Sequence, residues 1–264
     1  MADNDKRVAA LILAGGTIKP DMASVSGGVQ NRALIDLNGR PMLDYVVEAV
    51  RGGLAQAGVA GRLLVAGEVP TPPGAVAIAG GTSLVDTLLA GVAALAPNET
   101  RLLVATADIP FLTPPAVADF VARACALEEA QFVFPIVEAA RCRAEFPEMK
   151  RTTLRIAEGE FTGGNLVLLN PRFARENEAV IRAAWDRRKS VPGLAALLGP
   201  GILFRLVASR FFPNLLSITP IERAVSRAIG GKARALITPF AEIGSDVDRS
   251  GDVEIARRRL FPAK

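Results

Sequence analysis

The sequence predicts an α/β fold in which helices flank a doubly wound, mostly parallel sheet of the Rossmann-like type. Short, continuously apolar segments of strand length alternate with longer segments whose apolar residues recur at helical spacing. The first apolar segment, 8–14, ends in Gly15 and Gly16, and glycine or acidic turns follow later strands as well. Ligands bind at the carboxyl ends of the strands in sheets of this kind. A ligand site is therefore expected where the first strand ends.

The first half of the chain contains the regular part of this pattern. A polar loop at 17–31 follows the first strand, and its length is typical of functional loops. An Asn38-Gly39 turn then precedes an amphipathic helix at 41–57, with Pro41 at its first position. The further strands expected here are 62–66, 75–79, 101–106 and 131–135. The further helices are one marked by Val85, Leu88, Leu89, Val92 and Leu95, and one at 115–127.

The pattern is less regular after residue 138. In chain order we expect a hairpin flanked by 150–153 and 161–165, a strand at 166–169, helices within 172–232, a strand at 233–238, an acidic turn at 245–252 and a final basic helix. No internal repeat or linker divides the sequence. We therefore treat 1–264 as a single domain that contains a helical insertion at 172–232.

The composition restricts the chemistry. The 264 residues are 50% hydrophobic, which is enough for a sizeable core without disulfides. The two cysteines lack metal-ligand spacing and indicate a reducing, cytoplasmic setting, and no secretory leader or membrane span is expected. The sequence has no histidine, which excludes imidazole bases and histidine ligands. Any metal is therefore expected to have oxygen ligands, as Mg²⁺ does.

The net charge of +4 favours small anionic ligands over nucleic acid as partners. The 31 basic residues are dispersed and only 5% of the residues are aromatic, whereas nucleic-acid surfaces combine clustered Lys/Arg with stacking aromatics. One segment, 202–217, is apolar with Arg205 and Arg210 interleaved. It is consistent with a buried helix, a homodimer surface or a helix on anionic lipid. We favour the first two over membrane-surface contact.

Turns at expected strand ends carry the candidate chemistry. Residues 15–16 could cradle phosphates with freed backbone N–H groups. Residues 80–83 could bind a base edge or an anion at a helix start, or could simply cap that helix. Asp108 follows an apolar strand and is a candidate Mg²⁺ ligand, or a turn-forming residue. Asp246 and Asp248 are expected to point to opposite faces, so that at most one of them would meet Asp108.

Together these motifs resemble the sugar-phosphate and molybdopterin nucleotidyltransferase superfamily, and within it the MobA-like NTP transferases. The resemblance rests on Leu13-Ala14-Gly15-Gly16, Arg32-Ala33-Leu34, Gly39-Arg40-Pro41-Met42-Leu43, Gly80-Gly81-Thr82-Ser83-Leu84-Val85-Asp86, Ala107-Asp108-Ile109-Pro110 and Asp246-Val247-Asp248-Arg249-Ser250-Gly251-Asp252. It covers most of 7–170 and about 233–260, whereas 172–232 resembles an insertion of a less characterised branch. The resemblance implies a sheet of the nucleotide-diphospho-sugar transferase type.

The resemblance also implies Mg²⁺-dependent transfer of an NMP from an NTP to a phosphorylated small-molecule or lipid-linked acceptor, with release of pyrophosphate. The implied nucleotide-binding residues are Leu13, Ala14, Gly15, Gly16, Gly81, Thr82 and Ser83. The implied metal ligands are Asp108, Asp248 and, less directly, Asp246. Asn165 would face the acceptor. By their charge, Lys150 and Arg151 are candidates for clamping the acceptor phosphate or pyrophosphate, with a solvated turn as the alternative.

The first loop departs from the family pattern. The usual Gly-x-Gly/Ser-x-Arg-Met-Gly signature is missing, and Arg32 stands where a lysine is usual. Arginine keeps the charge and can bind phosphate bidentately, so Arg32 is the expected catalytic cation, and Lys19 could share its role. Two alternatives stay open: a catalytically weakened nucleotide-binding module, and a glycosyltransferase that uses a nucleotide sugar, because 246–248 is an Asp-x-Asp sequence.

Overall fold

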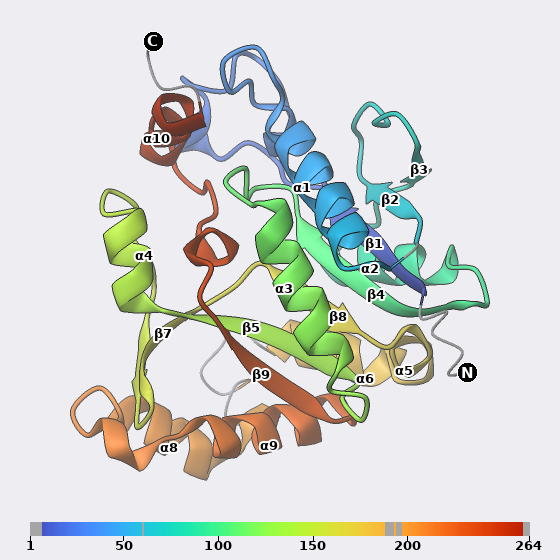
Figure 1. Cartoon of the computed structure of the whole chain (residues 1–264). Coiled ribbons are helices and arrows are strands. Elements are labelled where there is room, and N and C mark those ends of the chain that lie inside the picture. Colours follow the sequence, from blue (N-terminus) through green and yellow to red (C-terminus); the bar gives the residue numbers. More distant parts are fainter. Residues whose placement is uncertain (1–6, 60, 188–192, 194–196, 261–264) are drawn as a thin grey trace.

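The computed structural model describes residues 7–59, 61–187, 193 and 197–260. Within them, nine strands form one sheet in the order β3-β2-β1-β4-β8-β5-β7-β6, and β9 pairs with β5 (Figure 1). The strands are β1 (Arg7–Leu13), β2 (Leu63–Ala66), β3 (Ala75–Ile78), β4 (Glu99–Thr106), β5 (Phe132–Glu138), β6 (Leu154–Ile156), β7 (Gly159–Gly163), β8 (Leu166–Leu169) and β9 (Ala233–Thr238). The predicted Rossmann-like α/β fold is confirmed.

The sheet has a parallel half and a mixed half. Leu11 of β1 lies opposite Leu64 of β2 and Val104 of β4, and all of these strands are parallel, as is β3 beyond β2. In the other half, β8 runs antiparallel between β4 and β5, and β9 is parallel to β5. The carboxyl ends of β1 and β4 therefore meet at one edge of the sheet.

The continuous hydrophobic sequence of β1 follows from burial on both faces. Ala10 and Ile12 belong to the apolar cluster that includes α1 and α3, whereas Ala9 and Leu11 belong to the cluster that includes Val92 of α2. Parallel strands are joined by helical crossovers that cover both faces of the sheet. Both faces of β1 therefore carry apolar side chains.

Helices form a layer on each side of the sheet. In Figure 1, α1 (Met42–Gln56) and α3 (Pro114–Cys125) lie in front of it, with α2 (Leu84–Ala93), α5 (Pro171–Glu176) and α6 (Glu178–Arg187) behind. The other helices are α4 (Ala139–Glu145), α8 (Pro200–Ala208), α9 (Ile218–Ile229) and α10 (Ser250–Leu260), and the 3₁₀ turns are η1 (Pro20–Met22), η2 (Arg32–Leu34), η3 (Pro213–Leu215) and η4 (Ala241–Gly244). In the described part of the chain, no helix has the length and apolarity needed to cross a bilayer.

The expectation that 172–232 is helical is confirmed for α5, α6, α8 and α9 but not for 209–217, which forms turns and η3. Residues 188–192 and 194–196 lie outside the described residues. The buried-helix interpretation of 202–217 is wrong for one side of α8. Ile202 and Leu206 pack inward against the cluster formed with Leu216, but the side chains of Phe204 and Phe211 are 71% and 78% exposed. The apolar composition of 202–217 left a buried helix and two kinds of surface helix open, and the structure shows that α8 has one apolar side packed and one exposed.

Candidate functional site

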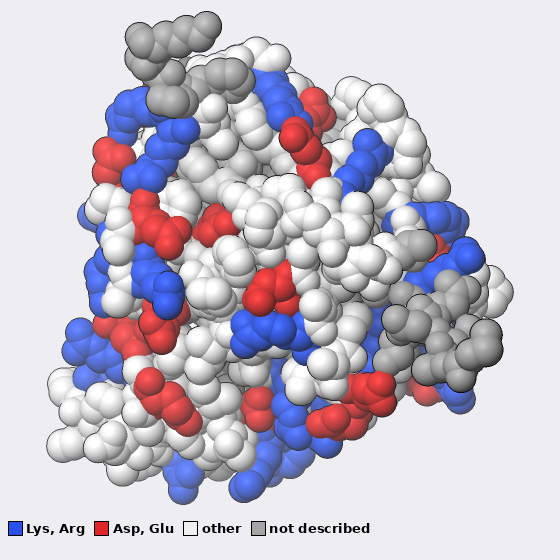
Figure 2. Space-filling model, viewed as in Figure 1, with Lys and Arg blue, Asp and Glu red and all other residues white. Residues whose placement is uncertain are grey.

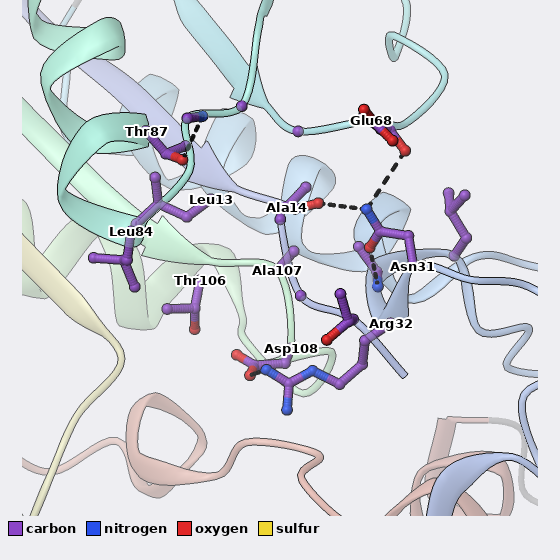
Figure 3. Close-up of a pocket in the computed structure, with 18 of the residues that line it drawn as sticks. Leu13, Ala14, Asn31, Arg32, Glu68, Leu84, Thr87, Thr106, Ala107 and Asp108 are labelled. Atoms are coloured by element: carbon purple, nitrogen blue, oxygen red, sulfur yellow. Dashed lines mark hydrogen bonds and ion pairs between the residues drawn. The ribbon is translucent and has the colours of Figure 1, made fainter. Parts of the chain in front are cut away.

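A pocket of about 570 Å³ opens at the carboxyl ends of β1 and β4 (Figure 3). Four segments and two further residues form most of its wall: 13–17, 30–34, 80–84, 106–108, Gly67 and Glu68. All seven predicted nucleotide-binding residues line it: Leu13, Ala14, Gly15, Gly16, Gly81, Thr82 and Ser83. Its volume lies within the usual range for small-ligand sites, ~300–1,000 Å³.

Gly81 and Gly15 differ in the space that a side chain would have at their positions. A Cβ at Gly81 would lie 2.2 Å from the Cβ of Asp86, so no side chain fits between the turn and α2. A Cβ at Gly15 would meet no atom within 4 Å. Packing therefore requires glycine at 81, whereas at 15 the protein itself leaves open space beside the pocket.

The turn at 80–83 is built as a helix cap. Ser83 Oγ accepts a hydrogen bond from Asp86 N at 3.1 Å, and the Thr82 and Ser83 hydroxyls donate to Asp86 Oδ2 at 2.6 and 2.8 Å. Arg182 of α6 pairs with the other oxygen of Asp86. The hydroxyls of Thr82 and Ser83 and the Arg182 guanidinium hold the pKa of Asp86 well below its usual range. The capping interpretation is confirmed, and the tie to Arg182 was missed because the two residues are far apart in sequence.

Asn31, which sequence reasoning also missed, fixes the end of the long loop. Its Nδ2 donates to Ala14 O at 2.6 Å and to Glu68 O at 3.4 Å, and its Oδ1 accepts from Ala33 N at 2.9 Å (Figure 3). The next residue, Arg32, donates its backbone N–H to Gly16 O at 2.7 Å. The loop at 17–31 therefore begins and ends beside the carboxyl end of β1, and the Arg32 side chain lies beside the pocket. An N-cap asparagine before a short helical turn was the only available signal.

Asp108, Asp246 and Asp248 converge beside the pocket. Each offers a carboxylate oxygen, and these three atoms lie within 4.8 Å of one another. Val247 N donates to Asp108 O at 2.8 Å, and the Val247 side chain is fully buried. The expectation that Asp246 and Asp248 point to opposite faces is wrong, because residues two apart in extended chain project to the same side. Val247 takes the opposite side.

Three cations surround the carboxylates. Arg32 Nη2 lies 2.6 Å from Asp108 Oδ2, and Arg32 Nη1 pairs with Asp248. Lys19 Nζ lies 2.9 Å from Asp248 Oδ2. The structure thus places both predicted catalytic cations at the carboxylate cluster.

Arg151 is the third cation. It pairs with Asp246, and its Nη2 donates to Asp246 O at 2.8 Å. The solvated-turn interpretation of 150–152 is wrong for Arg151, whose side chain is only 11% exposed, whereas Lys150 is exposed. Asn165 directly precedes β8, and its Nδ2 donates to Ile243 O at 3.2 Å, which holds η4 against the sheet.

The carboxylates differ in their ionisation. Burial raises the pKa of Asp246, and the charges of Asp108 and Asp248 raise it further against the opposing effect of Arg151. Burial would also raise the pKa of Asp248, but Lys19 and Arg32 outweigh it and lower the pKa. Because Asp246 resists ionisation beside two other carboxylates, a further positive charge at the cluster would stabilise its ionised form.

Three buried polar side-chain atoms at the site have no hydrogen-bond partner within the described part of the chain. Thr106 Oγ1 and Asp108 Oδ1, both in the pocket wall, have no hydrogen-bond partner among the described residues, and neither has Arg151 Nε. Buried polar groups are normally hydrogen-bonded. Three converging carboxylates and an unpartnered carboxylate oxygen fit a hard divalent cation, which takes oxygen ligands.

The comparison with family models matches the MobA-like NTP transferase domain to residues 10–211. The chain belongs to this family. The resemblance found in the sequence is thereby confirmed, and the protein is placed among the NTP transferases. The match includes the pocket turns, Asp108 and Arg151, whereas Asp246 and Asp248 lie beyond it.

Solved structures extend the likeness over most of the chain. A hypothetical transferase from Thermus thermophilus is 37% identical with a TM-score of 0.79, over 94% of this chain and 99% of that one. A CMP:2-keto-3-deoxy-manno-octonic acid synthetase complexed with CTP is 15% identical with a TM-score of 0.59, over 96% and 98%. The 2-C-methyl-D-erythritol 4-phosphate cytidylyltransferase from Thermus thermophilus is 16% identical with a TM-score of 0.51, also over 96% and 98%. The last two share the fold. A comparison with curated protein sequences finds no match.

Proposed function

We propose that the protein transfers the NMP part of an NTP to a phosphorylated acceptor and releases pyrophosphate, with the help of Mg²⁺. The observation that carries the proposal is the place of Asp108, which lines the glycine-walled pocket and also belongs to the three-carboxylate cluster. A nucleotide in the pocket would have its phosphates beside that cluster. Of the solved structures with this fold, one is a cytidylyltransferase by name and another is a synthetase complexed with CTP.

The reaction needs little acid–base chemistry. An oxygen of the acceptor phosphate attacks the α-phosphorus, and a new P–O bond forms. The bond from the α-phosphorus to the oxygen that bridges to the β-phosphorus breaks, and pyrophosphate leaves with that electron pair. An ionised phosphate oxygen is already a nucleophile, so the chemistry is compatible with a chain that has no histidine.

The pocket residues bind and orient the nucleotide in this proposal. The open space at Gly15 lets phosphate approach the backbone N–H groups of Gly15 and Gly16. The hydroxyls of Thr82 and Ser83 already donate to Asp86, so base selection would fall to backbone groups of the turn other than Gly81 N–H and Ser83 C=O, which are bonded to Thr87. Thr106 Oγ1 is a free partner in the same wall.

The three aspartates would hold Mg²⁺, which supplies charge to the triphosphate and orients the α-phosphate. Arg32 and Lys19 now neutralise the same carboxylates. With a divalent ion on those carboxylates, both cations become available to bind phosphate oxygens. Arg32 and Lys19 are the catalytic cations of the proposal, and they stabilise the charge that develops on pyrophosphate.

The acceptor would enter on the side of Arg151. This guanidinium is largely buried, pairs with Asp246 and keeps one nitrogen, Nε, without a partner among the described residues. Arg151 and the exposed Lys150 would bind the acceptor phosphate, with Asn165 beside it. The acceptor is a phosphorylated small molecule or a lipid-linked phosphate.

The experiment is a pyrophosphate-release assay with each NTP, Mg²⁺ and a set of sugar, polyol and prenyl phosphates. The proposal expects release that needs one NTP, one acceptor and the metal, and that is lost in Asp108→Asn. Asp119→Asn is the matched control, because Asp119 lies on the surface of α3 in a pair with Arg123. NTP binding without turnover for any acceptor would favour a binding module. Tighter binding of a nucleotide sugar than of every NTP would favour a glycosyltransferase.

A further inference from the structure

Five large apolar side chains form an exposed patch on and after α8. The patch, called here the α8 patch, consists of Phe204, Val207, Phe211, Phe212 and Leu215. Its three phenylalanines are 71%, 78% and 66% exposed in chain order. Figure 2 shows uncharged surface at the lower left, where Figure 1 places α8. Large clustered apolar side chains on a surface mark an interaction site.

The patch is held outward by the packing beneath it. Ile202 and Leu206, on the opposite side of α8, pack into the cluster with Leu216, which is 1% exposed. Ala157 N donates to Leu216 O at 2.8 Å, and Ser209 Oγ donates to Leu206 O at 2.8 Å. Since one stripe of α8 is fixed to the sheet, the other stripe faces solvent.

Two cations, Arg205 and Arg210, flank the patch, and the nearby Glu158 is engaged, since its Oε1 accepts a hydrogen bond from Ile218 N at 3.0 Å. Residues 197–221 include no acidic residue, and their cations are Arg205 and Arg210. Arg205 and Arg210 are exposed, and neither takes part in an ion pair among the described residues. Apolar side chains flanked by unpaired cations are typical of helices that lie in a membrane interface.

We propose that the α8 patch docks on a membrane surface that carries anionic lipid headgroups. The phenylalanines would enter the boundary between headgroups and acyl chains, and Arg205 and Arg210 would contact lipid phosphates. A second copy of the chain fits less well. A two-fold contact through the patch would bring Arg205 and Arg210 of each copy toward the same cations of the other, with no acidic partner in the segment. This proposal does not depend on the enzymatic one.

The test is flotation of the full chain with vesicles of phosphatidylglycerol and phosphatidylcholine, compared with vesicles of phosphatidylcholine alone. We expect binding to the anionic vesicles that weakens with salt. The double variant Phe211→Ser/Phe212→Ser should lose binding by about tenfold or more, and its fold should be kept because both side chains are exposed. Arg205→Gln/Arg210→Gln should also lose binding.

Matched controls come from the same chain. Val76 and Val180 are 38% and 39% exposed away from α8, so Val76→Ser/Val180→Ser should bind as the wild type does. Arg172→Gln/Arg258→Gln removes the same charge from side chains that are 84% and 61% exposed elsewhere. Absence of binding to anionic vesicles would overturn the proposal. So would a dimer in sedimentation velocity that Phe211→Ser/Phe212→Ser dissociates, because the patch would then be a contact between copies.

Discussion

The two halves of the sheet differ in how completely helices cover their apolar side chains. Around β1 and β4, helices cover both faces, and the apolar side chains of α1 and α3 are buried. Around β5, β7 and β9, the helix α9 leaves an apolar cavity of about 440 Å³ against the strands, and α8 exposes the α8 patch. The first half carries the pocket proposed to bind the nucleotide, and the second leaves apolar side chains uncovered.

The carboxylate cluster lies where the halves meet. Asp108 follows β4 of the parallel half, whereas Asp246 and Asp248 follow β9 of the mixed half, and the bond from Val247 N to Asp108 O joins them. Because the cluster joins the two halves of the sheet, we expect substitutions at this junction to abolish turnover. Substitutions in the pocket should change nucleotide affinity, and substitutions in the later helices should change it only indirectly.

The largest effect is expected from Asp108→Asn. The carboxylate is shared by the pocket and the cluster, so its loss should reduce kcat by at least ~10²-fold. Steady-state pyrophosphate release measures the loss, with Asp119→Asn retaining wild-type rates. A variant Asp108→Asn that keeps near-normal kcat would show that the junction is structural.

Gly15→Ala should weaken nucleotide binding by about tenfold or more while leaving the melting temperature unchanged. The added methyl group meets no protein atom within 4 Å, but it would occupy space that phosphate needs. Titration calorimetry with the preferred NTP and a melting curve give the two readouts. Gly251→Ala, which also has no atom within 4 Å of its Cβ but lies at the start of α10, is the control. Unchanged affinity in Gly15→Ala would mean that phosphate binds elsewhere.

Arg32→Lys tests whether the arginine that replaces the usual lysine is an adaptation. The two guanidinium nitrogens reach Asp108 and Asp248 separately, and a single ammonium cannot span both. We expect kcat to fall by about tenfold, less than the ~10²–10³-fold that follows complete loss of a transition-state donor, because lysine keeps the charge. Arg40→Lys, which alters a surface pair with Glu48, should leave kcat unchanged. A rise in kcat would show that arginine weakens this enzyme.

Arg182→Ala should have the smallest effect, a several-fold rise in the dissociation constant of the nucleotide with little change in kcat. Arg182 acts through Asp86, which holds the turn at 80–83. Calorimetry measures the change, and Arg172→Ala, an exposed pair with Glu176, is the control. An unchanged dissociation constant would show that α6 does not influence the turn.

The contribution of the turn at 80–83 to the stability of the protein is expected to depend on pH. The pKa of Asp86 is lowered in the folded protein, so its contribution to stability is complete above the ordinary carboxyl pKa of about 3.9 and declines as pH falls below it. The difference in melting temperature between wild type and Asp86→Asn should be constant near neutral pH and shrink below about pH 4. A difference that grows with acidity would contradict the pairing with Arg182.

Sequence reasoning succeeded where local rules decide the structure. The apolar run of β1, the helical spacing of α1 and α3, and the cap at Ser83 each follow from a few neighbouring residues. The pocket-forming glycines were found for the same reason, since they lie directly after predicted strands. These positions depend little on what the rest of the chain does.

Sequence reasoning failed where contacts between distant segments determine the position of a side chain. The side on which Asp246 and Asp248 lie depends on Val247 docking against Asp108, and the tie from Arg182 to Asp86 joins α6 to α2. The sequence left a solvated turn open as an alternative for Arg151, because its partner, Asp246, is remote in sequence. For 202–217, the apolar composition did not show which side chains pack against the sheet and which stay exposed.

The most direct test of the central claim is calorimetric titration of the four NTPs, with and without Mg²⁺, into the wild type and Asp108→Asn. The claim is that the pocket and the carboxylate cluster together form one metal-assisted NTP site. It predicts that one NTP binds much more tightly with Mg²⁺ and that this gain disappears in Asp108→Asn. Equal binding with and without Mg²⁺, or a gain that survives Asp108→Asn, would contradict it.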